Sequence, residues 1–164
     1  MIMTAKQVLD KYWDSTAPVD PVAIANKVGI KVYTSSNMPK ELSGVIQKDK
    51  QSNKVIIIVN GSHNEHRQRF TIAHELGHYF NTEEFDGQID DSTDILIYNR
   101  DNNSSQRKFE VFKFAVELLM PKEAVYYFLF KKKYFTIKQL VEVFNVSEMA
   151  IVNRLKNLGI IKGL

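Results

Sequence analysis

The chain has 164 residues, of which 44% are hydrophobic and 25% are charged, and it contains no cysteine. This composition is that of one globular domain, or of one domain with a small appendage, and it excludes a disordered chain and a fibre. Without cysteine the chain has no disulfides, thiolate metal ligands or thiol nucleophiles. The formal net charge of +3 is too small to indicate a nucleic-acid-binding protein by itself.

The charge is spread unevenly along the chain. Residues 131–164 hold seven Lys/Arg and two Glu, whereas residues 1–130 have a net charge of −2. The first residues lack a basic segment followed by an apolar one, and no run of 18 apolar residues occurs. We therefore expect neither a signal peptide nor a membrane partner, and we expect a cytoplasmic location.

The first sixty residues alternate helix and strand signals. Residues 4–7 form a capping box before an amphipathic segment, and Asp20-Pro21 begins a second helix that ends at Gly29. Three β-branched runs follow and predict a small sheet, with a hairpin or meander between the last two. These runs cover residues 30–33, 44–46 and 55–59.

Two longer helical patterns come next, separated by an acidic segment. A capping box at residues 62–65 precedes a helix that reaches Phe80. Residues 82–101 hold seven Asp/Glu and one Arg, which predicts a loop or a short hairpin. Helical periodicity returns over residues 106–120, and Pro121 begins a further helix.

The last segment has the pattern of two short helices. Thr136 begins a third capping box, residues 145–146 indicate a tight turn, and Ser147 can cap the helix that follows. Two short helices joined in this way resemble a helix-turn-helix unit. We therefore predict an α+β fold, with one domain at 1–130 and a basic helical unit at 131–164 packed on it.

The residues that indicate chemistry lie within the first long helix, in the pattern H-E-x-x-H. His74 and His78 are four residues apart, so they lie one turn apart on one helix face and both can reach one Zn²⁺. Glu75 is then placed beside the metal rather than toward it, as a general base requires. Two histidines on an exposed helix face are the alternative interpretation. The apolar residues around them and the helix-weakening Gly77 favour the metal site.

A catalytic zinc needs a third protein ligand and one open position. His63 and His66 lie too far along the same helix, because eight residues rise about 12 Å. A carboxylate must therefore supply the ligand. We predict Glu110, early on the next strong helix, with Glu117 on nearly the same face as the fallback. The acidic segment offers the competing carboxylates Glu83, Glu84, Asp86 and Asp90.

Two segments resemble the signature of the ImmA/IrrE-type zinc metallopeptidases. They are residues 69–78, RFTIAHELGH, and residues 110–121, EVFKFAVELLMP. Weaker similarity upstream and downstream extends the resemblance over about residues 5–160. The sequence departs from the family pattern at residues 111–112, where Val-Phe replaces the frequent Ala-Asn, and at Asn81, where a His is common.

The resemblance implies a fold, a cofactor and a substrate. The fold would be a small zincin-like peptidase core, made of a short sheet, the H-E-x-x-H helix and a ligand helix, followed by the helix-turn-helix-like unit. Zinc would be bound by His74, His78 and Glu110, with Glu75 as the catalytic base. The substrate would be a protein, namely a transcriptional repressor of a phage, a mobile element or a toxin–antitoxin operon.

Three functions compete at this stage. A zinc endopeptidase needs a donor for the developing oxyanion, and Tyr79, Tyr98 and His66 remain open candidates. Its substrate could add a strand to the edge of the short sheet. The rivals are a DNA-binding module at residues 134–160 and a non-hydrolytic regulatory module whose metal site is structural. The intact Glu75 argues against a structural metal site, which needs no base.

The composition of the last helix argues against specific DNA binding. Its early positions carry Glu148, Met149, Ile151 and Val152. Helices that read bases place their polar contact residues at this end. The remaining candidates for DNA contacts are Asn153, Arg154, Lys156 and Asn157. We therefore expect this unit to pack on the core or to dock a protein substrate.

Overall fold

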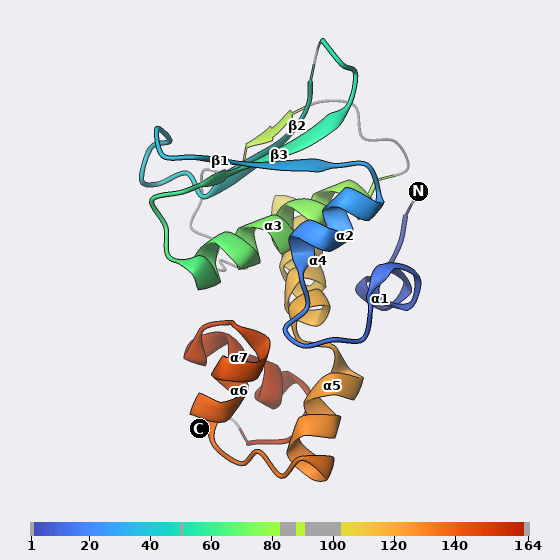
Figure 1. Cartoon of the computed structure of the whole chain (residues 1–164), viewed down its shortest axis with the longest axis vertical. Helices are drawn as coiled ribbons and strands as arrows, with labels where there is room; N and C mark the ends of the chain where they lie inside the picture. The colour runs from blue at the N-terminus through green and yellow to red at the C-terminus, as the bar shows by residue number, and fades with distance from the viewer. Residues whose placement is uncertain (1, 50, 83–87, 91–102, 163–164) are drawn as a thin grey trace.

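A computed structural model describes residues 2–49, 51–82, 88–90 and 103–162, and it arranges them as a mixed α+β fold (Figure 1). The elements in chain order are α1 (Ala5–Tyr12), α2 (Pro21–Lys27), β1 (Lys31–Ser35), β2 (Gly44–Lys48), β3 (Val55–Asn60), α3 (Glu65–Phe80), β4 (Gln88–Asp90), α4 (Asn103–Leu119), α5 (Lys122–Tyr126), the π-helix η1 (Tyr127–Lys131), α6 (Ile137–Phe144) and α7 (Glu148–Asn157). Within these described ranges, no helix is long and apolar enough to cross a membrane.

The helix starts follow the capping signals, with one exception. The capping boxes at Thr4 and Thr136 are both formed, and the Asp20 carboxylate accepts from the first backbone N–H groups of α2. The predicted cap at Ser62 is wrong, because Asn64 caps α3 by accepting from the backbone N–H of Arg67. The Ser62 hydroxyl instead donates to the side-chain oxygen of Asn60, at 2.6 Å.

The sheet has the strand order β1-β3-β2-β4. Strands β2 and β3 form the predicted hairpin, and β1 runs parallel to β3. β4 lies within the segment predicted as a loop or short hairpin, and it adds an antiparallel edge strand to β2. Residues 83–87 and 91–101 of that segment lie outside the described part of the chain. In Figure 1, α2 and α3 cover one face of the sheet.

Helix α4 crosses α3 on the side away from the sheet, and α5 to α7 extend beyond it (Figure 1). The apolar residues of these helices, including Leu140, Phe144 and Leu155, belong to the same buried cluster as those of α3 and α4. The turn between α6 and α7 is made by Asn145, whose φ of 50° lies in the left-handed region. The predicted helix after Pro121 continues through η1 in π-helical form.

Polar contacts fix the α6–α7 turn to the first half of α3. The Arg69 guanidinium donates to the carbonyl of Asn145 at 3.1 Å and to that of Val19 at 2.6 Å. The Asn145 amide donates to a carboxylate oxygen of Glu65 at 2.7 Å. Burial lowers the pKa of Arg69 from its usual value, and the carboxylates of Asp20 and Glu65 oppose that effect. The C-terminal helices are therefore joined to the helix that carries the histidine pair.

Candidate metal centre

Helix α3 carries the three residues of the H-E-x-x-H pattern into the interior. His74 and His78 are each 4% exposed and Glu75 is 1% exposed. The helix contacts β2 and β3 on one side and α4 on another, which explains why consecutive residues of its second half are buried. The interpretation of two histidines on an exposed helix face is therefore wrong.

The two imidazoles lie at a separation that suits one metal ion. The ring centroids of His74 and His78 are 4.9 Å apart, and the rings are inclined at 81°. Two imidazoles that bind one zinc ion, each at about 2.0–2.1 Å, have ring centres roughly 5 Å apart. The donor atoms and their spacing therefore fit zinc.

Glu75 projects toward the sheet, where Gly44 at the start of β2 leaves room for it. A Cβ atom at Gly44 would lie 2.4 Å from Cγ2 of Thr71 and 3.7 Å from Oε1 of Glu75. The first distance is far below contact, so only glycine allows β2 to approach α3 this closely. The close approach places the Glu75 carboxylate against the start of β2, on the turn of α3 that runs from His74 to His78.

A buried asparagine holds the chain that leads into Gly44. Asn60, at the end of β3, is fully buried, and its amide donates to the carbonyls of Pro39 and Leu42 at 3.0 and 2.8 Å. Its backbone N–H donates to the carbonyl of Ser43 at 2.8 Å. The Ser43 hydroxyl in turn accepts from the Arg67 guanidinium of α3 at 3.0 Å.

This support has no local signature in the sequence, because it depends on contacts between residues distant along the chain. A polar residue ending an apolar strand was the one available signal, and such a residue more often caps a turn.

A second glycine allows α4 to approach the histidine pair. A Cβ atom at Gly77 would lie 3.0 Å from a methyl of Val111 and 3.1 Å from its carbonyl oxygen. Gly77 precedes His78, and Glu110 precedes Val111, so the helices meet one residue away from both predicted ligands. Glu110 is exposed and lines a shallow groove together with Gly77 and Asn81.

The described residues do not form a complete ligand shell. Among them, no group of three His, Asp or Glu side chains is close enough to surround a metal ion. Glu110 as third ligand therefore stays a prediction. The Glu117 carboxylate lies 3.9 Å from the guanidinium of Arg154 on α7, so it faces that arginine. Of the competing carboxylates, Asp90 lies in β4, whereas Glu83, Glu84 and Asp86 lie outside the described residues.

The three candidates for an oxyanion donor have different positions. Tyr79 is half-buried on α3, next to His78 in sequence. His66 lies two turns before His74 and lines a groove between α3, α4 and α7. Tyr98 lies outside the described residues.

Two buried histidines one helical turn apart, with a glutamate after the first, are the arrangement of H-E-x-x-H metal-binding proteins. The family model described as the IrrE N-terminal-like domain matches residues 25–156. The chain therefore belongs to the ImmA/IrrE family, as the motifs of its two long helices predict.

Two known proteins are similar to the chain over different spans. The metallopeptidase ImmA of Bacillus subtilis (strain 168) is 42% identical over 50 residues, which are 30% of this chain and 28% of ImmA. A Mycobacterium tuberculosis transcriptional regulator has a similar fold, with a TM-score of 0.61 at 16% identity, over 93% of this chain and 44% of that one. The chain thus spans less than half the length of either protein.

Proposed function

We propose that the chain is a zinc-dependent endopeptidase that hydrolyses a peptide bond in a partner protein. The observation that carries the proposal is the buried pair of imidazoles, with ring centroids 4.9 Å apart and the Glu75 carboxylate next to them in sequence. Membership of the ImmA/IrrE family supports the same activity. His74, His78 and Glu110 would hold the metal, within a zincin-like core at residues 1–130.

Zinc bound there would supply Lewis-acid chemistry, which polarises a scissile carbonyl and lowers the pKa of a water molecule to near neutral. Glu75 would accept the proton of that water and pass it to the leaving amine. Its burial against Gly44 supports this role, because a carboxylate packed between a helix and a strand has few orientations open to it. Tyr79, Tyr98 and His66 stay the candidates for a donor to the oxyanion.

We further propose that the substrate is a helix-turn-helix transcriptional repressor of a phage, a mobile element or a toxin–antitoxin operon. Support comes from the family resemblance, and the named relative is a metallopeptidase. Residues 131–164, with α6 and α7 as a helix-turn-helix-like unit, would dock this protein rather than bind DNA. The burial of Arg154, which donates to the carbonyl of Met120, removes one of the four candidate DNA contacts.

The test is cleavage of a purified repressor encoded next to this gene by the zinc-loaded chain. We expect a single cut that a chelator abolishes and added zinc restores. The change Glu75→Gln should keep zinc and fold but lower the cleavage rate by about 10²–10⁴-fold, because glutamine cannot accept the proton. A Glu75→Gln variant with more than half of the wild-type rate would contradict the peptidase mechanism and favour a binding module.

A further inference from the structure

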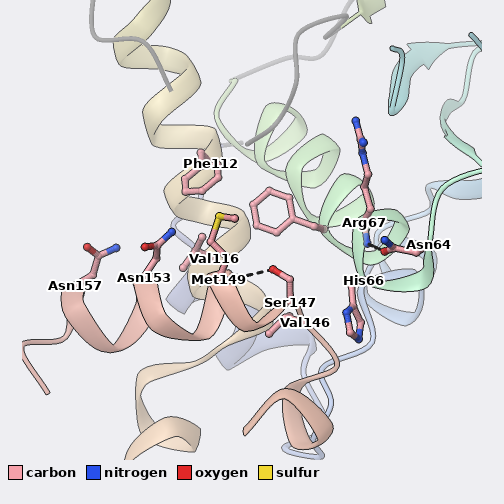
Figure 2. A pocket seen from close by; sticks show the side chains of 12 residues that line it. Asn64, His66, Arg67, Phe112, Val116, Val146, Ser147, Met149, Asn153 and Asn157 are labelled. Carbon is pink, nitrogen blue, oxygen red and sulfur yellow. Dashed lines mark hydrogen bonds between the residues drawn. The ribbon is translucent and has the colours of Figure 1, made fainter. Parts of the chain in front are cut away.

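A groove between α3, α4 and α7 reaches Phe70, one turn before His74, and apart from His66 its lining residues have no role in the chemistry described so far. Its walls come from Phe70 on α3, Phe112 and Val116 on α4, and Met149 and Ala150 on α7. Figure 2 shows Met149, Asn153 and Asn157 along the edge of α7 that faces Phe112 and Val116. We propose that this groove is a specificity subsite that accepts a bulky apolar side chain of an extended protein substrate, and this proposal rests on the proposed peptidase function.

The groove is aligned with the proposed metal site along α3. Arg67, Phe70, His74 and His78 follow one another at spacings of three, four and four residues, so they lie on one side of the helix. Phe70 and His74 are separated by about 6 Å along the helix axis. An extended peptide advances about 3.3 Å per residue. The side chain in the groove would therefore belong to a residue about two positions from the scissile bond.

The size and walls of the groove indicate which side chain it accepts. Its volume is about 230 Å³. An apolar cavity of about 150 Å³ holds benzene, so one leucine, methionine or phenylalanine side chain fits. The aromatic rings of Phe70 and Phe112 form a wall, with their centroids 5.3 Å apart. Met149 is 58% exposed at the mouth and would lose contact with water when the groove is filled.

The polar residues of the groove suit the backbone of such a substrate. Asn153 and Asn157 lie one turn apart on α7, and both are exposed. Asparagine amides both donate and accept hydrogen bonds, as the backbone of an extended peptide requires. Of the described residues that line the groove, none is acidic and Arg67 is a cation. A lysine or arginine side chain would therefore find no counter-charge there.

The experiment compares the wild type with a variant whose groove is filled. In Ala150→Phe the added ring occupies the groove, whereas in Lys156→Phe the same ring is added to an exposed position of α7 that does not line it. Melting temperature and zinc content of both variants are measured first. Each zinc-loaded protein then cleaves a randomised decapeptide library, and the products are sequenced by mass spectrometry.

We expect the wild type and Lys156→Phe to select an apolar residue about two positions from the cut. Ala150→Phe should reduce this selection about tenfold, because burial of one such side chain contributes at least that factor. Cleavage without apolar selection, or selection that persists in a folded Ala150→Phe, would overturn the subsite and leave the peptidase proposal intact. If Ala150→Phe does not fold, Met149→Ala takes its place and should weaken the selection.

A binding measurement separates failure of the subsite from failure of the peptidase. Immobilised, zinc-loaded Glu75→Gln protein is exposed to the same library, with and without Ala150→Phe. If neither the peptides nor the repressor is cleaved, the peptidase proposal fails, whereas an enrichment of apolar residues among the retained peptides that Ala150→Phe abolishes still shows that the groove binds apolar side chains. If cleavage occurs, the peptides retained by Glu75→Gln should be rich in apolar residues, and Ala150→Phe should abolish that enrichment. Retained peptides that are not enriched in apolar residues would contradict an apolar side chain as the occupant of the groove.

Discussion

Measured zinc affinity can show which of the two glutamates of α4 is the third zinc ligand. Glu110 lies next to the point where α4 meets Gly77, whereas Glu117 lies near Arg154. We expect Glu110→Gln to weaken zinc binding about tenfold or more, because it removes a direct ligand. Glu117→Gln is the matched control and should leave affinity unchanged. Competition with a chromophoric chelator measures both, and a loss confined to Glu117→Gln would make Glu117 the ligand.

Gly44 offers a test of how the strand holds the proposed base. In Gly44→Ala the new methyl would lie 2.4 Å from Cγ2 of Thr71, so either β2 or α3 must move. Overpacking of this kind destabilises by about 1–3 kcal/mol. We expect a lower melting temperature together with slower cleavage, because Glu75 moves with α3.

The second change Thr71→Ser makes the Gly44 test specific. It removes Cγ2 but keeps the hydroxyl that donates to the carbonyl of Arg67. The double variant should therefore recover part of the stability and of the cleavage rate that Gly44→Ala loses. If it recovers neither, the contact between Gly44 and Thr71 does not position the base.

At the scale of residues, the spacing of residues along the sequence predicted those features that depend on a single helix. The facing of His74 and His78 follows from the helical repeat alone, and the structure confirms that both are buried. Gly44 and Asn60 could not be given roles in the same way, because the partners described above lie 17 to 31 residues away in the sequence. The predicted cap at Ser62 was wrong for a related reason. The Ser62 hydroxyl donates to the side-chain oxygen of Asn60 and does not cap α3.

At the scale of elements, capping and periodicity predicted most helices within a few residues. β4 was predicted only as part of a loop or a short hairpin, because a strand of three residues carries little pattern and exists through its pairing with β2. The predicted helix after Pro121 changes to π-helical form at Tyr127, which no local signal indicated. The crossing of α3 and α4 depends on Gly77, and a helix-weakening glycine in a sequence does not reveal which element packs against it.

Helix α7 contains a buried arginine whose role differs from that of its exposed neighbours. The Arg154 guanidinium donates to the carbonyl of Met120 at 3.1 Å, and burial lowers its pKa from the usual value. We expect Arg154→Ala to destabilise the protein by about 1–3 kcal/mol, because a buried carbonyl loses its donor. Lys156→Ala, on the exposed side, should change stability by less than about 0.5 kcal/mol. Thermal unfolding of both variants checks this, and equal melting temperatures would contradict it.

At the scale of the whole molecule, the basic C-terminal segment and the nearly neutral remainder are physically connected. Arg69 of α3 holds the α6–α7 turn through the Asn145 carbonyl, and Glu65 accepts from the Asn145 amide. The apolar residues of both parts form one cluster. A substrate that contacts α7 would therefore contact a surface fixed relative to α3, as the groove proposal requires.

DNA binding is the property that tests the proposed role of this segment. With Arg154 buried, Lys156, Asn153 and Asn157 remain of the four candidate contacts on α7. We expect the chain alone to bind operator DNA no more tightly than about 1 μM at physiological salt, which is the non-specific range. Each phosphate contact adds a slope of about −0.9 to the log–log dependence on salt, so the residual binding should fall steeply.

The measurement is a titration of labelled operator DNA from the neighbouring repressor's promoter at two salt concentrations. The repressor alone is the positive control, and an unrelated duplex of equal length is the negative one. Equal, weak affinity for both duplexes is the expected result, because few cations and no crowded polar residues stand at the start of α7. Nanomolar binding that prefers the operator would contradict docking as the role of residues 131–164 and make them a DNA-reading unit.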